Sequence, residues 1–125
     1  MKTEQELIDS IKTFEDAQKA TGRPDCPDFS DVPKDLEKYF NAQYKAVVIA
    51  EALNDGWKPN WDDSNEWKYF PWFVMSPGSF AYGGTDCWSS DSGAGTGSRL
   101  CFRTSKMAAY AGAQFIEIWK DLMLK

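Results

Sequence analysis

Apolar residues recur with a helical period at both ends of the chain, and the middle follows a strand-like pattern. Two pairs with capping-box spacing, Thr3 with Glu6 and Thr13 with Asp16, predict an N-terminal helix that breaks near Lys12 and restarts. The apolar face of this segment consists of Leu7, Ile11, Phe14 and Ala17. We expect this helical segment to end at Gly22, because glycine is the commonest residue just past a helix C-terminus.

A proline-rich connector, residues 22–33, separates this segment from a second helix over residues 33–54. Pro33 suits the first helical position, and Asn54-Asp55-Gly56 provides the stop. We expect residues 47–50 to be the buried centre. The predicted apolar side consists of Leu36, Phe40, Tyr44, Val47, Val48 and Leu53.

Aromatic and β-branched residues dominate after Gly56 and predict strands. The first covers residues 67–75, where Pro71 requires an edge position or a bulge because proline cannot donate to a ladder. A turn at 76–78 leads to a second strand over 80–82, with an extension to Trp88 as an alternative. A glycine- and serine-rich loop precedes a short third strand at 100–103.

A final helix is expected to start after Thr104 or Ser105. Its apolar stripe consists of Ala108, Ala111, Phe115, Ile118 or Trp119, and Leu122. Segregated helices and strands indicate the α+β class. We therefore predict N-terminal helices, a small three-stranded antiparallel sheet and a C-terminal helix, packed as a single two-layer domain over residues 1–125. The helix of residues 33–54 and the C-terminal helix would cover the sheet.

Charge is unevenly distributed on this acidic chain, whose net charge is −5. Residues 1–97 carry nine basic and seventeen acidic side chains, and residues 98–125 carry five basic and two acidic ones. The acidic body makes duplex nucleic acid an unfavourable partner. The basic C-terminal end leaves head-to-tail self-association open beside a simple effect on solubility. No apolar run is long enough for a membrane span, and the polar start of the chain favours the cytoplasm.

The chain contains no histidine, which removes Ser-His and Cys-His nucleophile pairs. We predict no enzymatic activity, no cofactor and no metal site. Acidic residues near position 63 could offer oxygen ligands to calcium, but their spacing differs from an EF-hand and favours a solvated loop. Glycines at 93–97 lead into a predicted strand, which favours a flexible connection over a phosphate loop. Cys87 and Cys101 are interpreted as small apolar residues rather than a disulfide.

Seven aromatic residues fall within positions 57–73, including four of the six tryptophans. Such rings either build a core or form a binding surface for a protein or a small ligand. Strand alternation predicts Trp67, Tyr69 and Phe73 facing the helices and Lys68 facing water, with two large rings left on the opposite face. We expect an interaction surface made of Trp57, Trp61, Phe70 and Trp72.

Several strings in combination resemble small uncharacterised proteins encoded by phages, prophages and other mobile elements of gut Bacteroidetes. The resemblance spans about residues 13–120. Its strings are Phe14–Ala17, Tyr44–Asn54, Gly56–Trp61, Lys68–Phe73, Gly97–Phe102, Tyr110–Gly112 and Gln114–Phe115. It implies a phage or mobile-element origin and a location in the host cytoplasm or the virion. It assigns no activity, cofactor or catalytic residue.

These observations predict a non-enzymatic protein that acts through protein–protein contact, either virion-associated or host-directed. A protein partner or self-association is expected. The alternative is a module that binds a small ligand or single-stranded nucleic acid on the aromatic segment 57–73.

Overall fold

The computed structural model describes residues 2–125, which form five α-helices, one 3-10 turn and a two-stranded antiparallel sheet. The helices and strands are α1 (Glu4–Ser10), α2 (Phe14–Thr21), α3 (Lys34–Asn54), β1 (Lys68–Val74), η1 (Pro77–Ser79), β2 (Ala81–Trp88), α4 (Ser105–Gln114) and α5 (Ile116–Met123). The α+β class is therefore confirmed. No helix of the described chain combines the length and hydropathy needed to cross a bilayer.

The N-terminal break is confirmed in detail. Thr3 and Thr13 each accept a hydrogen bond from the backbone N–H three residues later, and Glu6 and Asp16 accept from the cap backbone in return. Gly22 caps α2 in the left-handed region at φ 74°. Each of these features depends on residues a few positions apart, so the local sequence is sufficient to specify it.

The prediction for α3 holds for its length and is wrong for part of its buried side. Pro33 precedes the helix as N-cap instead of occupying its first turn, and Leu36 is exposed. Most of the closest packing comes from small side chains, because α2 and α5 both lie against this helix. The buried residues of α3 are Ala42, Ala46, Val48, Ile49, Ala50, Ala52, Leu53 and Asn54.

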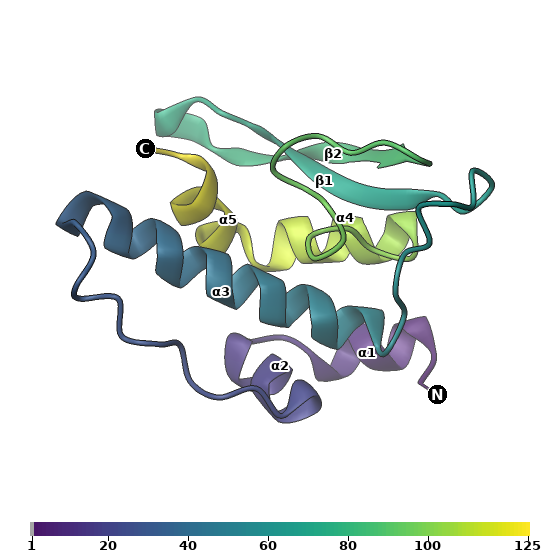
Figure 1. Ribbon diagram of the computed structural model, residues 1–125, viewed down its shortest axis with the longest axis horizontal. Coiled ribbons are helices and arrows are strands. Elements are labelled where there is room, and N and C mark those ends of the chain that lie inside the picture. The colour runs from purple at the N-terminus through teal and green to yellow at the C-terminus, as the bar shows by residue number, and fades with distance from the viewer. Residues whose placement is uncertain (1) are drawn as a thin grey trace.

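Figure 1 shows the sheet at the top, α4 and α5 beneath it, and α1 and α2 at the bottom beside α3. The helix under the strands is α4, since α3 packs chiefly against α2 and α5; the prediction that α3 covers the sheet is wrong. Gly112 of α4 makes this contact close. A Cβ there would lie 2.7 Å from the Tyr82 ring and 2.8 Å from Pro71.

The predicted third strand is wrong. Phe102 forms a single antiparallel bridge with Tyr69, in which each backbone N–H donates to the other residue's carbonyl, at 3.0 and 2.7 Å. The next β1 residue that faces the same edge is Pro71, which has no N–H to extend the ladder. The segment around Phe102 is buried, so its apolar character reflects the core and not a strand.

The alternation predicted for residues 67–73 is confirmed at four positions, Tyr69, Phe70, Trp72 and Phe73, and wrong at two. Phe73 is buried against Trp119 and Tyr69 is half-buried, while Trp72 lies on the opposite, solvent-facing side. Trp67 was expected inside but is 49% exposed, because it precedes the first paired residue and is not held in the pleat. Lys68 was expected to face water but is fully buried.

Candidate interaction surface

The face of the sheet that points away from α4 carries the alternate residues of both strands. On β1 these are Lys68, Phe70, Trp72 and Val74. Opposite them on β2 lie Trp88, Asp86, Gly84 and Ala81, as the register pairs them. Because the sheet has only two strands, this face is narrow, and three of its eight residues are aromatic: Phe70, Trp72 and Trp88. We call it the outer face.

Trp72 lies flat on the backbone of two glycines. It is paired across the strands with Gly84, and a β-bulge at this point places Gly83 beside it. A Cβ at Gly84 would be 2.8 Å from the indole, and one at Gly83 would overlap the ring. The glycines therefore let the ring settle against β2 while 46% of the side chain stays exposed. One ring face is packed, and the rest is available to a partner.

Phe70 has a neighbour on the same face. Its ring stacks on Trp88 with centroids 5.2 Å apart and planes 12° from parallel, a diagonal cross-strand pair. Both side chains are half-buried. Phe70 therefore contributes to the outer face as part of a rigid pair rather than as a free ring.

Lys68 fixes the loop of residues 57–66 against this face. Its Nζ donates to the backbone carbonyls of Asn60 (2.6 Å), Asp63 (3.1 Å) and Ser89 (2.7 Å), and lies 3.5 Å from a Glu66 carboxylate oxygen. Three carbonyl acceptors and a carboxylate satisfy the buried ammonium, as a buried charge requires.

Trp61 covers the same ammonium. The Lys68 Nζ lies 5.1 Å from the centroid of its ring, within cation–π range. Its indole N–H donates to the Ser98 hydroxyl at 2.7 Å. Trp61 therefore closes one end of the outer face and is held there by contacts from two loops.

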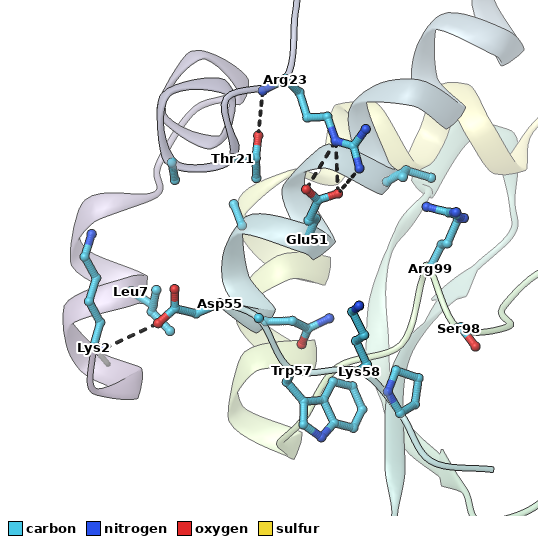
Figure 2. Close-up of a pocket in the computed structure, with 16 residues that line it drawn as sticks. Lys2, Leu7, Thr21, Arg23, Glu51, Asp55, Trp57, Lys58, Ser98 and Arg99 are labelled. Atoms are coloured by element: carbon cyan, nitrogen blue, oxygen red, sulfur yellow. Dashed lines mark hydrogen bonds and ion pairs between the residues drawn. The ribbon is translucent and has the colours of Figure 1, made fainter.

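Trp57 lies elsewhere. It lines a cavity of about 850 Å³ at the C-terminal end of α3, between that end and the N-terminal helices. Figure 2 shows Lys58 beside Trp57, and Arg99 on the side of the ion pair between Arg23 and Glu51. In that pair the Arg23 nitrogen lies 2.9 Å from the Glu51 carboxylate oxygen. Basic side chains near the C-terminal end of α3 stabilise the negative end of its dipole. Their presence in the cavity therefore does not by itself indicate a bound ligand.

Three of the four predicted rings thus share one surface, whereas Trp57 lines the cavity and is linked to that surface through its hydrogen bond to Glu66. Residues that the sequence analysis missed complete that surface: Gly83, Gly84, Asp86 and Trp88 of β2, with Lys68 beneath the loop. The predicted turn at 76–78 is the sequence feature from which the two glycines could have been found. Pairing the chain outward from it brings the Gly-Gly pair opposite Trp72.

The acidic loop is organised by its own contacts. The Glu66 carboxylate accepts the backbone N–H of Asn60 at 2.6 Å and the Trp57 indole N–H at 3.4 Å, in addition to its contact with Lys68. Within residues 2–125 no cluster of three or more carboxylate, thiol or imidazole groups is arranged to hold a metal ion.

Strand β1 separates the two cysteines that could have formed a disulfide. Tyr69 pairs with Cys87 on one edge and with Phe102 on the other. Two inter-strand spacings amount to roughly 10 Å, beyond the reach of a disulfide. Cys26, Cys87 and Cys101 are all free thiols.

Burial raises the pKa of the Cys101 thiol to about 11. We expect native protein at pH 8 to leave Cys101 unmodified by iodoacetamide and urea-unfolded protein to react there. The folded thiol keeps its proton up to about pH 11, while the unfolded one releases it near pH 8.5. The folded state therefore binds more protons, and the free energy of unfolding should fall as pH rises through this window.

Peptide mapping by mass spectrometry after labelling measures the first effect, and urea titrations at increasing pH measure the second. The Cys101→Ala variant is the control and should show a shallower decline. Rapid native labelling of Cys101 would contradict the buried placement.

Comparisons with known proteins give no relative. No protein-family model matches this chain, and neither the curated proteins nor the solved structures contain a match. The chemistry and geometry of the outer face are therefore the basis for a functional proposal.

Proposed function

We propose that this chain is a non-enzymatic binding protein that contacts a protein partner through the outer face. The observation that carries the proposal is Trp72, which lies flat on Gly83 and Gly84 with 46% of its side chain exposed. Val74 of the same face is 44% exposed and continues the apolar surface. Contiguous exposed apolar side chains of this size mark interaction sites more often than isolated ones do.

The rigidity of the rings favours affinity. Trp72 is held by the glycines and Phe70 by its stack on Trp88, so binding would immobilise few additional rotamers. Tryptophan is the residue type most enriched among positions that dominate interface energies. Within residues 2–125, β2 pairs with no strand other than β1. Its open edge offers backbone groups to an added strand beside the rings.

The biological setting of the proposal comes from the resemblance to phage and mobile-element proteins. In that setting the partner is a virion component or a host protein, and the contact forms in the host cytoplasm or on the virion. The acidic segment around the rings disfavours duplex nucleic acid as the partner.

Site-specific photo-crosslinking tests the proposal. We expect benzoylphenylalanine placed at position 72 to give discrete protein adducts in cells of a Bacteroidetes host, because the replaced indole would lie inside the contact. Gly83→Ala should reduce crosslinking from the neighbouring position 74, since the added methyl group displaces the Trp72 ring. Mass spectrometry identifies the adduct, and an adduct of twice the chain mass would identify self-association.

The matched control position is Tyr39, an aromatic residue on α3 that is 40% exposed and is not part of the outer face. Adducts that form equally well from positions 39 and 72, or none from position 72, would remove the support for a contact at the outer face.

A second candidate function is binding of a small planar ligand on the rings. The flat, half-exposed indole of Trp72 favours it, because such a surface also stacks on a sugar face or a nucleobase. Tryptophan fluorescence titrated with oligosaccharides and single-stranded oligonucleotides separates the two functions. A ligand-dependent change that Trp72→Ala abolishes would favour this second candidate.

A further inference from the structure

The segment that carries Trp61, Phe70 and Trp72 is predominantly acidic. Residues 60–91 contain five carboxylates and a single basic side chain, Lys68. The Lys68 ammonium is fully buried and already bonded to three carbonyls. The segment that carries the exposed rings therefore offers negative charge to solvent and no accessible positive charge.

One of these carboxylates stands beside Trp72. Asp86 pairs across the strands with Phe70, so it is the diagonal neighbour of Trp72 on the same face, with side chains within about 8 Å. It is exposed, and its Oδ1 accepts the Cys87 backbone N–H at 2.8 Å. Among residues 2–125 no lysine or arginine forms an ion pair with it. The second oxygen is free to accept a hydrogen bond from a ligand.

The open face of the Trp72 indole attracts cations. Its other face rests on Gly83 and Gly84, so the solvent side presents the negative part of the ring quadrupole. The molecule already uses an indole in this way internally, where the Lys68 ammonium lies 5.1 Å from the Trp61 ring centroid.

We propose that the protein segment recognised by the outer face carries an arginine whose guanidinium stacks on Trp72 and donates to Asp86. This inference rests on the proposed function and names the chemistry of the partner. Arginine fits better than lysine, because its planar group can stack on a ring while its N–H groups reach a carboxylate in the same plane. The negative charge of residues 60–91 adds a long-range attraction for a basic segment.

Titration with matched peptides tests this chemistry. The probe is acetyl-Gly-Arg-Gly-Arg-Gly-amide, and its twin carries citrulline, which keeps the planar shape and removes the charge. We expect the arginine peptide to shift the NMR signals of the Trp72 indole N–H and the Asp86 amide and to bind at least about fivefold more tightly than its twin. Trp72→Ala and Asp86→Asn should each weaken binding about fivefold.

Two exposed residues of the same types provide controls. Trp67→Ala, which removes a ring outside the pleat, and Asp91→Asn, which removes a carboxylate beyond the end of β2, should leave affinity unchanged. Equal affinity for both peptides, equal losses in the control variants, or no binding at millimolar peptide would overturn the inference. If the arginine inference failed in this way but position 72 still crosslinked to a protein, the proposed function would stand and the partner would be recognised by a different chemistry.

Discussion

Replacing Lys68 with methionine is expected to lower the free energy of unfolding by about 2–4 kcal/mol. Methionine fills most of the same volume but cannot donate to the carbonyls of Asn60 and Ser89. The Ser89 carbonyl would lose its bond to the ammonium, and Glu66 would lose its counter-charge. Part of this loss is offset, because the variant no longer removes an ammonium from water.

Urea unfolding followed by circular dichroism measures the effect of Lys68→Met. The control is Lys58→Met, a change at an exposed lysine in the same loop, which should alter stability by less than about 0.5 kcal/mol. Trp61 should also become more accessible to acrylamide quenching, since the ammonium beneath it is gone. If Lys68→Met and Lys58→Met behaved alike, the ammonium would not organise the loop.

Replacing Phe115 with alanine is expected to cost about 3–5 kcal/mol. The ring is buried at the junction of α4 and α5 and meets Tyr110 edge to face with centroids 6.2 Å apart. The backbone here also changes helix, because the Phe115 carbonyl accepts the N–H groups of Ile118 and Trp119. Loss of the ring would leave a cavity where neither helix can easily close in.

Thermal and urea unfolding of Phe115→Ala measure this cost. Phe115→Leu keeps most of the apolar volume and should cost clearly less. Met123→Ala serves as the surface control, because Met123 is nearly half exposed in the last turn of α5. A loss below about 1 kcal/mol for the alanine variant would place Phe115 outside the core.

The sequence predicted the helical parts well because their signals are local. Both capping boxes and Gly22 act within one helical turn, and the structure confirms them. The apolar stripe of the C-terminal segment is also confirmed at its buried positions, although the chain breaks into two helices at Phe115. Periodicity identifies the buried face of a helix even when it does not reveal a change of direction.

The aromatic segment was predicted only in part because its burial depends on distant contacts. Alternation placed Phe70 and Trp72 together on the outer face, and the structure confirms that placement. It could not show that the Trp72 ring packs on Gly83 and Gly84, because that contact depends on the register between β1 and β2. Nor could it show that Trp57 lines a cavity at the end of α3.

The sequence by itself determined the α+β class, the helix boundaries other than the break between α4 and α5, and the strand face that carries Phe70 and Trp72, since each follows from residues close together in the chain. Tertiary structure decided the fate of Lys68 and of the segment around Phe102. Strand alternation predicts that Lys68 is exposed. In the structure the loop of residues 57–66 folds over it and supplies backbone carbonyls that accept hydrogen bonds from its ammonium. The apolar run around Phe102 predicts a strand from sequence alone. In the structure its pairing with β1 stops after one bridge, because Pro71 on that edge has no N–H to donate.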